Sequence, residues 1–167
     1  MTPLVTMLGF ARRGGDKTRR HNAVRDILFL AARGAALSVE REPKHLLLRG
    51  GQKPTDLLLR DYTEGFHASA FDVTISDTLQ PTSLDRAVAV TGYVAQVAHE
   101  KFLLKYQDSC RESNLAFLPL VWGSTDGATS TVHSTLESWS NLEADHCGLL
   151  RSRIRARLCT QDSSWLL

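Results

Sequence analysis

The hydrophobic pattern first predicts a helix near the start of the chain. From His21 onwards, apolar residues recur at intervals of three and four, a spacing that places them on one face of a helix. This stripe consists of Val24, Ile27, Leu28, Ala31 and Ala35. Gly34 lies near its end, where glycine commonly stops a helix. We therefore expect an amphipathic helix that begins at His21 and packs one face on a core.

Three short strands are predicted next. Residues 37–42 form a short strand that Pro43 ends. Residues 55–62 contain three consecutive leucines, which is typical of a strand buried on both faces. Residues 68–76 alternate in polarity, so successive side chains point to opposite faces. One face carries Phe71, Val73 and Ile75, and the other carries Asp72, Thr74 and Ser76.

The second half of the chain predicts a long helix, one strand and two further helices. The helix covers residues 84–113, and Gly92 can weaken or split it. Its expected inner stripe is Leu84, Val88, Thr91, Ala95, Ala98, Phe102 and Tyr106. A strand follows at 115–121, and helices at 131–143 and 147–159. This order predicts an α/β fold with a mixed central sheet of about four strands, flanked by helices.

Composition is compatible with one globular domain. The chain has 167 residues, of which 43% are hydrophobic and 23% charged, so it can bury a core without disulfides or metal. The net charge of +2 excludes a histone-like basic protein but allows a local basic face. We expect a flexible basic arm at 1–20, an α/β core at 21–122, and a helical extension packed on the core at 123–167.

Cysteine use and hydropathy bear on the compartment. The three cysteines are widely spaced and form no Cys-x-x-Cys pair, which argues against a disulfide framework or a zinc knuckle and favours a reducing compartment. No apolar run approaches the ~18 residues that a membrane span requires. The short apolar stretch at the N-terminus precedes its charges, unlike a secretory signal. We expect an intracellular protein that does not associate with membranes.

Two aspartates are the sharpest chemical feature. Asp56 starts one predicted strand and Asp72 lies within the next, so a hairpin-like connection would place them side by side. A carboxylate inside an apolar strand is costly unless it is compensated, and two carboxylates repel each other. A bound Mg²⁺ or Mn²⁺ is one compensation. The alternative is structural: Asp56 caps a turn, and Asp72 pairs with Arg60 or Arg86.

Several short motifs carry a family resemblance. The order of a helix, a strand, a strand with Pro-x-Asp and a strand with Asp-x-Thr is similar to the core of PD-(D/E)XK, or restriction-endonuclease-like, nucleases. More closely, residues 12–167 resemble the C-terminal region of reverse-transcriptase-bearing retroelement proteins of animals. The motifs are RHNAVRD at 20–26, REP at 41–43, KPTD at 53–56, AFDVTIS at 70–76 with LQ at 79–80, FLPLV at 117–121 and SWL at 164–166.

The resemblance implies roles for three acids. Asp56 would be the first metal ligand and Asp72 the second. Glu42, at the end of the first strand, resembles an additional acid that some of these nucleases place near the metal. Its alternative reading is a solvated charge at the edge of the sheet. The implied activity is hydrolysis of DNA phosphodiesters with Mg²⁺ or Mn²⁺ as cofactor.

The chain departs from the family pattern at the catalytic lysine. Two residues after the second aspartate the chain has Thr74, whose hydroxyl can orient a water but brings no positive charge. Lys101 and Lys105 are four apart on the long helix and share a face. We expect Lys105 first, and Lys101 second, to supply the missing charge. Alternatively, both are solvated lysines that pair with Glu100 or Asp108.

Basic residues near the N-terminus suggest contact with nucleic acid. His21, Asn22 and Arg25 would open the first helix, and a helix N-terminus beside arginine suits a phosphate. The alternative is a helix cap with a surface charge. The arm suits the DNA backbone, or is a solvated tail. Its basic residues are Arg12, Arg13, Lys17, Arg19 and Arg20.

Three functions are compatible with these features. The first is a metal-dependent endonuclease-like domain derived from a mobile element. The second is an inactive nucleic-acid-binding remnant, and the third is a non-enzymatic structural module. Because the Cys/His cluster and the polymerase of the related proteins are not in this sequence, the chain resembles a fragment or a stranded gene copy, once joined to a reverse transcriptase region. The resemblance also implies a nuclear location.

Overall fold

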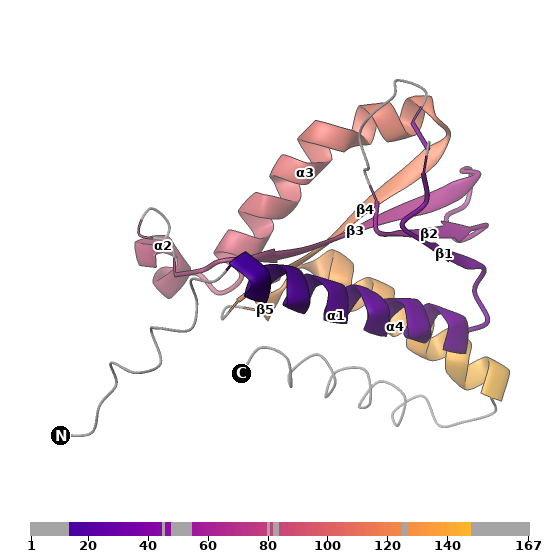
Figure 1. Cartoon of the computed structure of the whole chain (residues 1–167), viewed down its shortest axis with the longest axis horizontal. Coiled ribbons are helices and arrows are strands. Elements are labelled where there is room, and N and C mark those ends of the chain that lie inside the picture. The colour runs from indigo at the N-terminus through magenta and orange to yellow at the C-terminus, as the bar shows by residue number, and fades with distance from the viewer. Residues whose placement is uncertain are drawn as a thin grey trace.

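A mixed five-stranded sheet forms the centre of the molecule (Figure 1). The computed structural model describes residues 14–44, 46–47, 55–79, 81, 84–124 and 127–147. In chain order the elements are α1 (Gly14–Gly34), β1 (Val39–Arg41), β2 (Leu57–Arg60), β3 (Ala68–Ser76), α2 (Leu84–Ala89), α3 (Tyr93–Glu112), β4 (Leu115–Gly123), β5 (Gly127–Ala128) and α4 (Ser130–Cys147). The predicted α/β class with a helix-flanked mixed sheet is confirmed.

The strands follow one another across the sheet in the order β1-β2-β3-β4-β5. The first three form an antiparallel meander, β4 pairs parallel to β3, and β5 returns antiparallel to β4. Because two parallel neighbours need a crossover connection, α3 leads the chain back from the end of β3 to the start of β4. The nine-residue register from Ala68↔Leu115 to Ser76↔Gly123 makes β3 and β4 the central pair.

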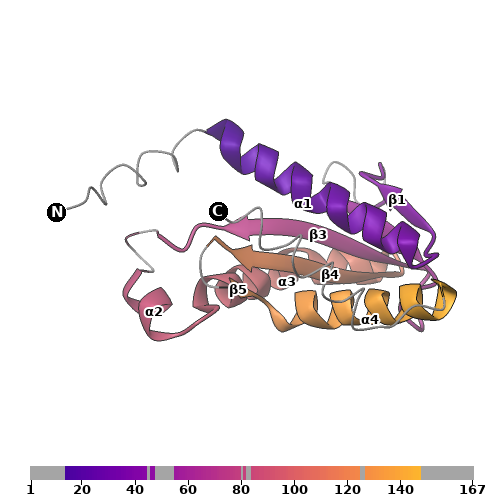
Figure 2. The same ribbon diagram turned by 90° about the horizontal axis from the view of Figure 1, so that it is seen from below.

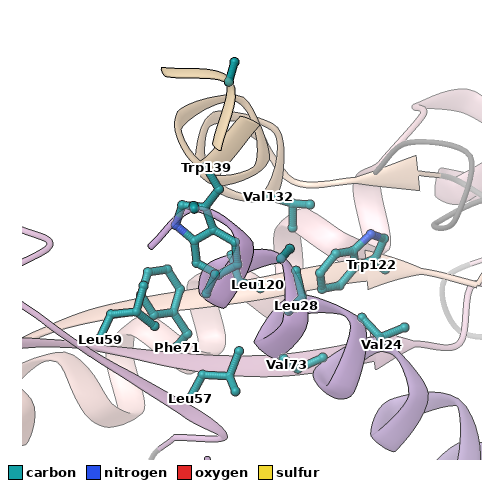
Figure 3. Close-up of a cluster of buried hydrophobic side chains, with 14 residues drawn as sticks. Val24, Leu28, Leu57, Leu59, Phe71, Val73, Leu120, Trp122, Val132 and Trp139 are labelled. Atoms are coloured by element: carbon teal, nitrogen blue, oxygen red, sulfur yellow. The ribbon is translucent and has the colours of Figure 1, made fainter. Parts of the chain in front are cut away.

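Helices α1 and α4 lie side by side on one face of the sheet, and α3 covers the other (Figure 2). The larger core cluster lies beneath α1 and α4. In Figure 3, Val132 and Trp139 reach it from α4, Val24 and Leu28 from α1, and the remaining labelled residues from the sheet. The smaller cluster lies beneath α3; its buried members are Leu58, Ala68, Ala70, Tyr106, Cys110, Leu115 and Phe117.

The first helix begins earlier than the sequence predicts. It starts at Gly14 rather than His21, so residues 14–20 belong to α1 and not to an arm. Lys17 and Arg19 are exposed there, and no apolar stripe marks these turns. Residues 1–13 of the expected arm lie outside the described residues. The predicted stripe itself is correct, because Val24 and Leu28 are buried against the sheet.

The long predicted helix is divided in two. Gly92 has a left-handed backbone with φ of 79° and forms the N-cap of α3, a conformation that glycine adopts without strain. The residues before it form α2, in which no side chain is buried. The stripe is therefore wrong at Leu84, Thr91 and Val88, the last of them 81% exposed, because the chain before Gly92 does not pack on the sheet. From Ala95 onwards the helix does contribute buried residues.

Smaller differences concern the end of the chain. The strand predicted at 115–121 continues to Gly123, so the expected boundary between core and extension at 122 and 123 falls inside β4. The pattern does not predict the two-residue strand β5. The helix predicted at 131–143 is longer, Ser130–Cys147, and the helix predicted beyond it lies outside the described residues. Of the helices in the described ranges, none is both long and apolar enough to cross a bilayer.

Trp139 offers a test of the larger core. Its indole is 0% exposed and meets Phe71 and Tyr62 edge-to-face at centroid distances of 5.6 and 6.3 Å. Truncation to alanine removes these contacts and leaves a cavity. We expect Trp139→Ala to lower the free energy of unfolding by about 3–5 kcal/mol in urea denaturation. The control Val88→Ala should change it by less than about 0.5 kcal/mol; equal effects would contradict the described packing of α4.

Candidate functional site

The pairing of β2 with β3 places Asp56 opposite Asp72. The last pair in the register is Leu57↔Phe71, so the next positions are 56 and 72. The Asp56 backbone N–H donates to the Phe71 carbonyl at 2.9 Å, and the Val73 N–H donates to Asp56 Oδ2 at 2.8 Å. The Asp56 carboxylate is thus fixed against β3. Both aspartates are half-buried, and two adjacent carboxylates come together as the sequence pattern predicts.

Asp72 is in an environment that disfavours its charge. Burial, and then the neighbouring charge of Asp56, raise the pKa of Asp72 from 3.8 to about 7. Three groups lower the pKa of Asp72 instead. The Thr74 hydroxyl donates to Asp72 Oδ2 at 3.2 Å, and the charges of His21 and Lys105 also lower the pKa. Side chains from α1, β3 and α3 therefore converge on this carboxylate.

His21 is the partner of Asp56. Its Nε2 lies 3.3 Å from Asp56 Oδ1, and the side chains are 31% and 17% exposed. The hydrogen bond to Asp56 raises the pKa of His21 above 6.5. The predicted position of His21 and Asn22 at a helix N-terminus is wrong, because α1 begins seven residues earlier and both lie in its interior. Nothing in the sequence pattern indicated that His21 would reach Asp56.

Arg25 and Glu42 compensate each other. Arg25 Nη1 forms an ion pair with Glu42 Oε1, and Arg25 Nη2 pairs with Asp26 Oδ1 at 3.0 Å. Asp26 also accepts from Arg41 at 3.1 Å. The Glu42 backbone lies beside the site, because its N–H donates to the Asp56 carbonyl at 2.7 Å. Its carboxylate, however, pairs with arginine, so the prediction of an additional acid at the metal and of Arg25 as a phosphate ligand is not supported.

The alternative partners proposed for Asp72 are engaged elsewhere. Arg60 Nη1 lies 3.2 Å from His67 Nε2. Arg86 Nη1 donates to the Tyr93 hydroxyl at 3.0 Å, and its guanidinium carbon lies 5.8 Å from the centre of that ring. Neither arginine is among the charges that act on Asp72. Structural ion pairing to arginine therefore does not account for this buried aspartate.

The two lysines of α3 lie on the side of the aspartates. The charge of Lys105 acts on Asp72, and its Nζ is 4.6 Å from the centre of the Tyr106 ring. Lys101 and Lys105 both line a cleft beside β3. Glu100, proposed as an alternative partner, accepts a hydrogen bond from Gln96 at 3.0 Å. Of the two, Lys105 is the lysine whose charge acts on Asp72.

The cleft was not foreseen from the sequence. It has a volume of about 640 Å³ and lies between the start of α1, the end of β3 and the first half of α3. Lys17, Asp77 and Tyr93 are lining residues that the sequence pattern did not single out as a site. Lys17 stood only among the arm residues, and no motif marks the other two. Arg12 and Arg13 lie outside the described residues, while Arg19 is exposed and Arg20 half-buried on α1.

The aspartate pair is compatible with Mg²⁺ but is not an all-protein metal cage. Among the described residues, no group of three or more His, Cys, Asp and Glu side chains is arranged to hold a metal ion. Mg²⁺ usually takes one or two carboxylates and fills its other positions with water and phosphate oxygens. Each carboxylate has about four acceptor positions. Asp56 uses one on His21 and one on Val73, so acceptor capacity remains on both aspartates.

Comparison with known proteins does not assign a family. No family model matches the chain, and no curated protein matches it.

The raised pKa of Asp72 predicts how stability depends on pH. A carboxyl whose folded pKa lies above its unfolded pKa favours folding only while protonated, so its contribution is lost as the pH rises from about 4 to about 7. We expect Asp72→Asn to be more stable than the wild type by roughly 2–4 kcal/mol at pH 8, and by much less at pH 4. Urea denaturation at both pH values measures the difference.

Asp108→Asn, an exposed position on α3, serves as the control and should show no such pH-dependent gain. A stability difference between Asp72→Asn and wild type that stays constant from pH 4 to pH 8 would show that the Asp72 pKa is not raised.

Proposed function

We propose that the chain is a metal-dependent endonuclease-like domain of restriction-endonuclease-like architecture, derived from a mobile element and acting on DNA phosphodiesters. The observation that carries this proposal is the pair of half-buried aspartates, Asp56 directly before β2 and Asp72 within β3, with the charge of Lys105 acting on Asp72. The order of a helix, three strands, two helices and a strand at the start of the described chain also supports it. Strongly perturbed carboxyl groups cluster at functional sites more often than elsewhere.

The residues have separate roles in this proposal. Asp56 and Asp72 would hold Mg²⁺ or Mn²⁺, which supplies Lewis-acid activation of water and of the phosphoryl group. Thr74 holds Asp72 through its hydroxyl and can orient a water. Lys105 supplies the positive charge that the family pattern places two residues after the second acid, and it offsets negative charge that develops on the phosphate. His21 orients Asp56 through Nε2.

An inactive nucleic-acid-binding remnant is the second candidate. It is favoured because the chain itself partly compensates the charge of both carboxylates: His21 and the Val73 N–H bind Asp56, and the Thr74 hydroxyl binds Asp72. Such a site persists without metal. It also has Thr74 where the related nucleases have lysine. This remnant would bind nucleic acid through its basic surface in a salt-sensitive way and would not cleave it.

Cleavage of supercoiled plasmid separates the two candidates. We expect nicking by the wild type with Mg²⁺ or Mn²⁺ and none with EDTA. Asp72→Asn and Asp56→Asn should each lower the rate by about a hundredfold or more, because each removes half of the charge that holds the ion. The matched control Asp85→Asn, exposed on α2, should leave nicking unchanged. Binding of nucleic acid with no cleavage of either plasmid or single-stranded DNA would support the remnant and exclude the enzyme.

Lys105 is tested against its neighbour one turn away. Lys105→Met should lower the nicking rate by about ten- to a hundredfold, because it removes the charge nearest the reacting phosphate. Lys101→Met should lower the rate less. Lys105→Arg should restore part of the activity, since it keeps the charge. Equal losses at positions 101 and 105 would show that both act only by attracting DNA, and would remove Lys105 from the reaction.

A further inference from the structure

The cleft beside the aspartates combines positive charge with an apolar wall. Among the described residues, three lysines line it, Lys17 from α1 and Lys101 and Lys105 from α3, against a single acid, Asp77. The remaining described lining is mostly apolar or aromatic: Ile75, Ser76, Tyr93, Val94, Val97, Ala98 and Phe102. A volume of about 640 Å³ lies within the range of sites that enclose an organic ligand. Its charge is complementary to a polyanion.

The lysines are distributed along the cleft rather than gathered at one point. Lys101 and Lys105 are one helical turn apart, about 6 Å along α3, and Lys17 faces them from α1. Lys105 is shared with the aspartate pair, because its charge also acts on Asp72. A chain of phosphates that follows this row of lysines would lead directly to the two carboxylates.

The apolar wall discriminates between kinds of polyanion. A double helix presents phosphates and the edges of its bases, while the base faces are stacked inside. An apolar wall would make few favourable contacts with such a surface and would remove water from its phosphates. An unpaired strand exposes its base faces, and proteins that bind single strands combine a basic groove with aromatic and apolar surfaces on which bases stack. Tyr93 and Phe102 supply aromatic rings in the cleft.

We infer that this cleft binds an unpaired polynucleotide strand, with the phosphates on Lys17, Lys101 and Lys105 and the bases against the apolar wall of α3. The inference deepens the proposed function, on which it rests for any reaction at the aspartates, by naming a single strand as the substrate class. Binding itself does not require the metal. Single-strand binding in the cleft and cleavage at the aspartates can therefore fail separately.

Binding in EDTA tests the cleft without cleavage. Fluorescence anisotropy is measured for labelled single strands of about twelve nucleotides, as DNA and as RNA, and for a hairpin duplex of the same DNA sequence. We expect one or both single strands to bind at least about tenfold more tightly than the duplex. Raising salt from about 50 to 200 mM should weaken this binding. Preference for the duplex, or equal binding of single strand and duplex, would overturn the inference.

Two matched pairs of variants locate the binding on the molecule. Val97 and Leu104 are both exposed on α3, by 46% and 87%, but only Val97 lines the cleft. Val97→Asp should weaken single-strand binding by about fivefold or more, and Leu104→Asp should change it by less than about twofold. Likewise Lys101→Ala should weaken binding more than Lys44→Ala, a lysine exposed after β1. Equal effects within either pair would overturn the assignment to this cleft.

A polyanion without bases completes the design. Inorganic polyphosphate has the charge of the strand but nothing to stack, so we expect it to compete with the single strand only weakly. Competition as strong as that of unlabelled single strand would show that charge alone is recognised and would overturn the role of the apolar wall. Cleavage of the labelled single strand and nicking of plasmid, both with Mg²⁺ or Mn²⁺, are scored separately in the same preparations. The absence of both, with intact single-strand binding, would overturn the nuclease and leave the cleft assignment in place.

Discussion

The antiparallel register of β2 on β3 is the constraint on which both the core and the candidate site depend. Because side chains alternate between the faces of a strand, the pair Leu57↔Phe71 directs apolar groups under α1 and α4. The next pair along, at positions 56 and 72, is formed by the two carboxylates. A slip of β2 by one residue would turn Leu57 to the face covered by α3, bring Leu58 beneath α1 and α4, and move Asp56 away from Asp72. The burial of Phe71 therefore also fixes the position of Asp72.

The charge of the site is shared among elements that are distant in the sequence. Asp56 meets His21 from α1, Asp72 meets Thr74 from its own strand, and Lys105 acts from α3. These groups only partly offset the burial and mutual repulsion of the two acids, since the pKa of Asp72 stays near 7. A buried group kept at a cost to stability is a common feature of functional sites. It is the physical reason to look for chemistry here rather than at the Arg25 and Glu42 pair, where the charges are balanced.

The helix α3 links the aspartate pair to the cleft. One side of α3 packs on the sheet through Tyr106 and Cys110, while Val97, Lys101 and Lys105 line the cleft. Gly92 allows the chain to turn between α2 and α3, so α3 begins independently of the unpacked helix before it. The same helix thus completes the smaller core, brings a positive charge to Asp72, and forms the apolar wall on which bases would stack.

The sequence alone determined the features that depend on local periodicity. Alternation of polarity located β3 with its correct bounds, the stripe from Val24 to Ala35 located the buried face of α1, and the glycine at position 92 indicated a division that occurs. Local periodicity also put Asp56 and Asp72 on neighbouring strands. It could not show the start of α1, since turns without an apolar stripe carry no signal, nor the exposure of α2, since burial needs a partner surface.

Only the tertiary structure decided which charges meet. His21 reaches Asp56 across 35 positions of sequence and Lys105 acts on Asp72 across 33, while Arg25 neutralises Glu42, which the motif had assigned to the metal. The cleft, too, is made by three elements whose lining residues share no motif. Such pairings depend on how the helices pack on the sheet, and electrostatic energies depend on distance and burial in space. The distance between two charges and their burial are not encoded in the spacing of residues along the chain.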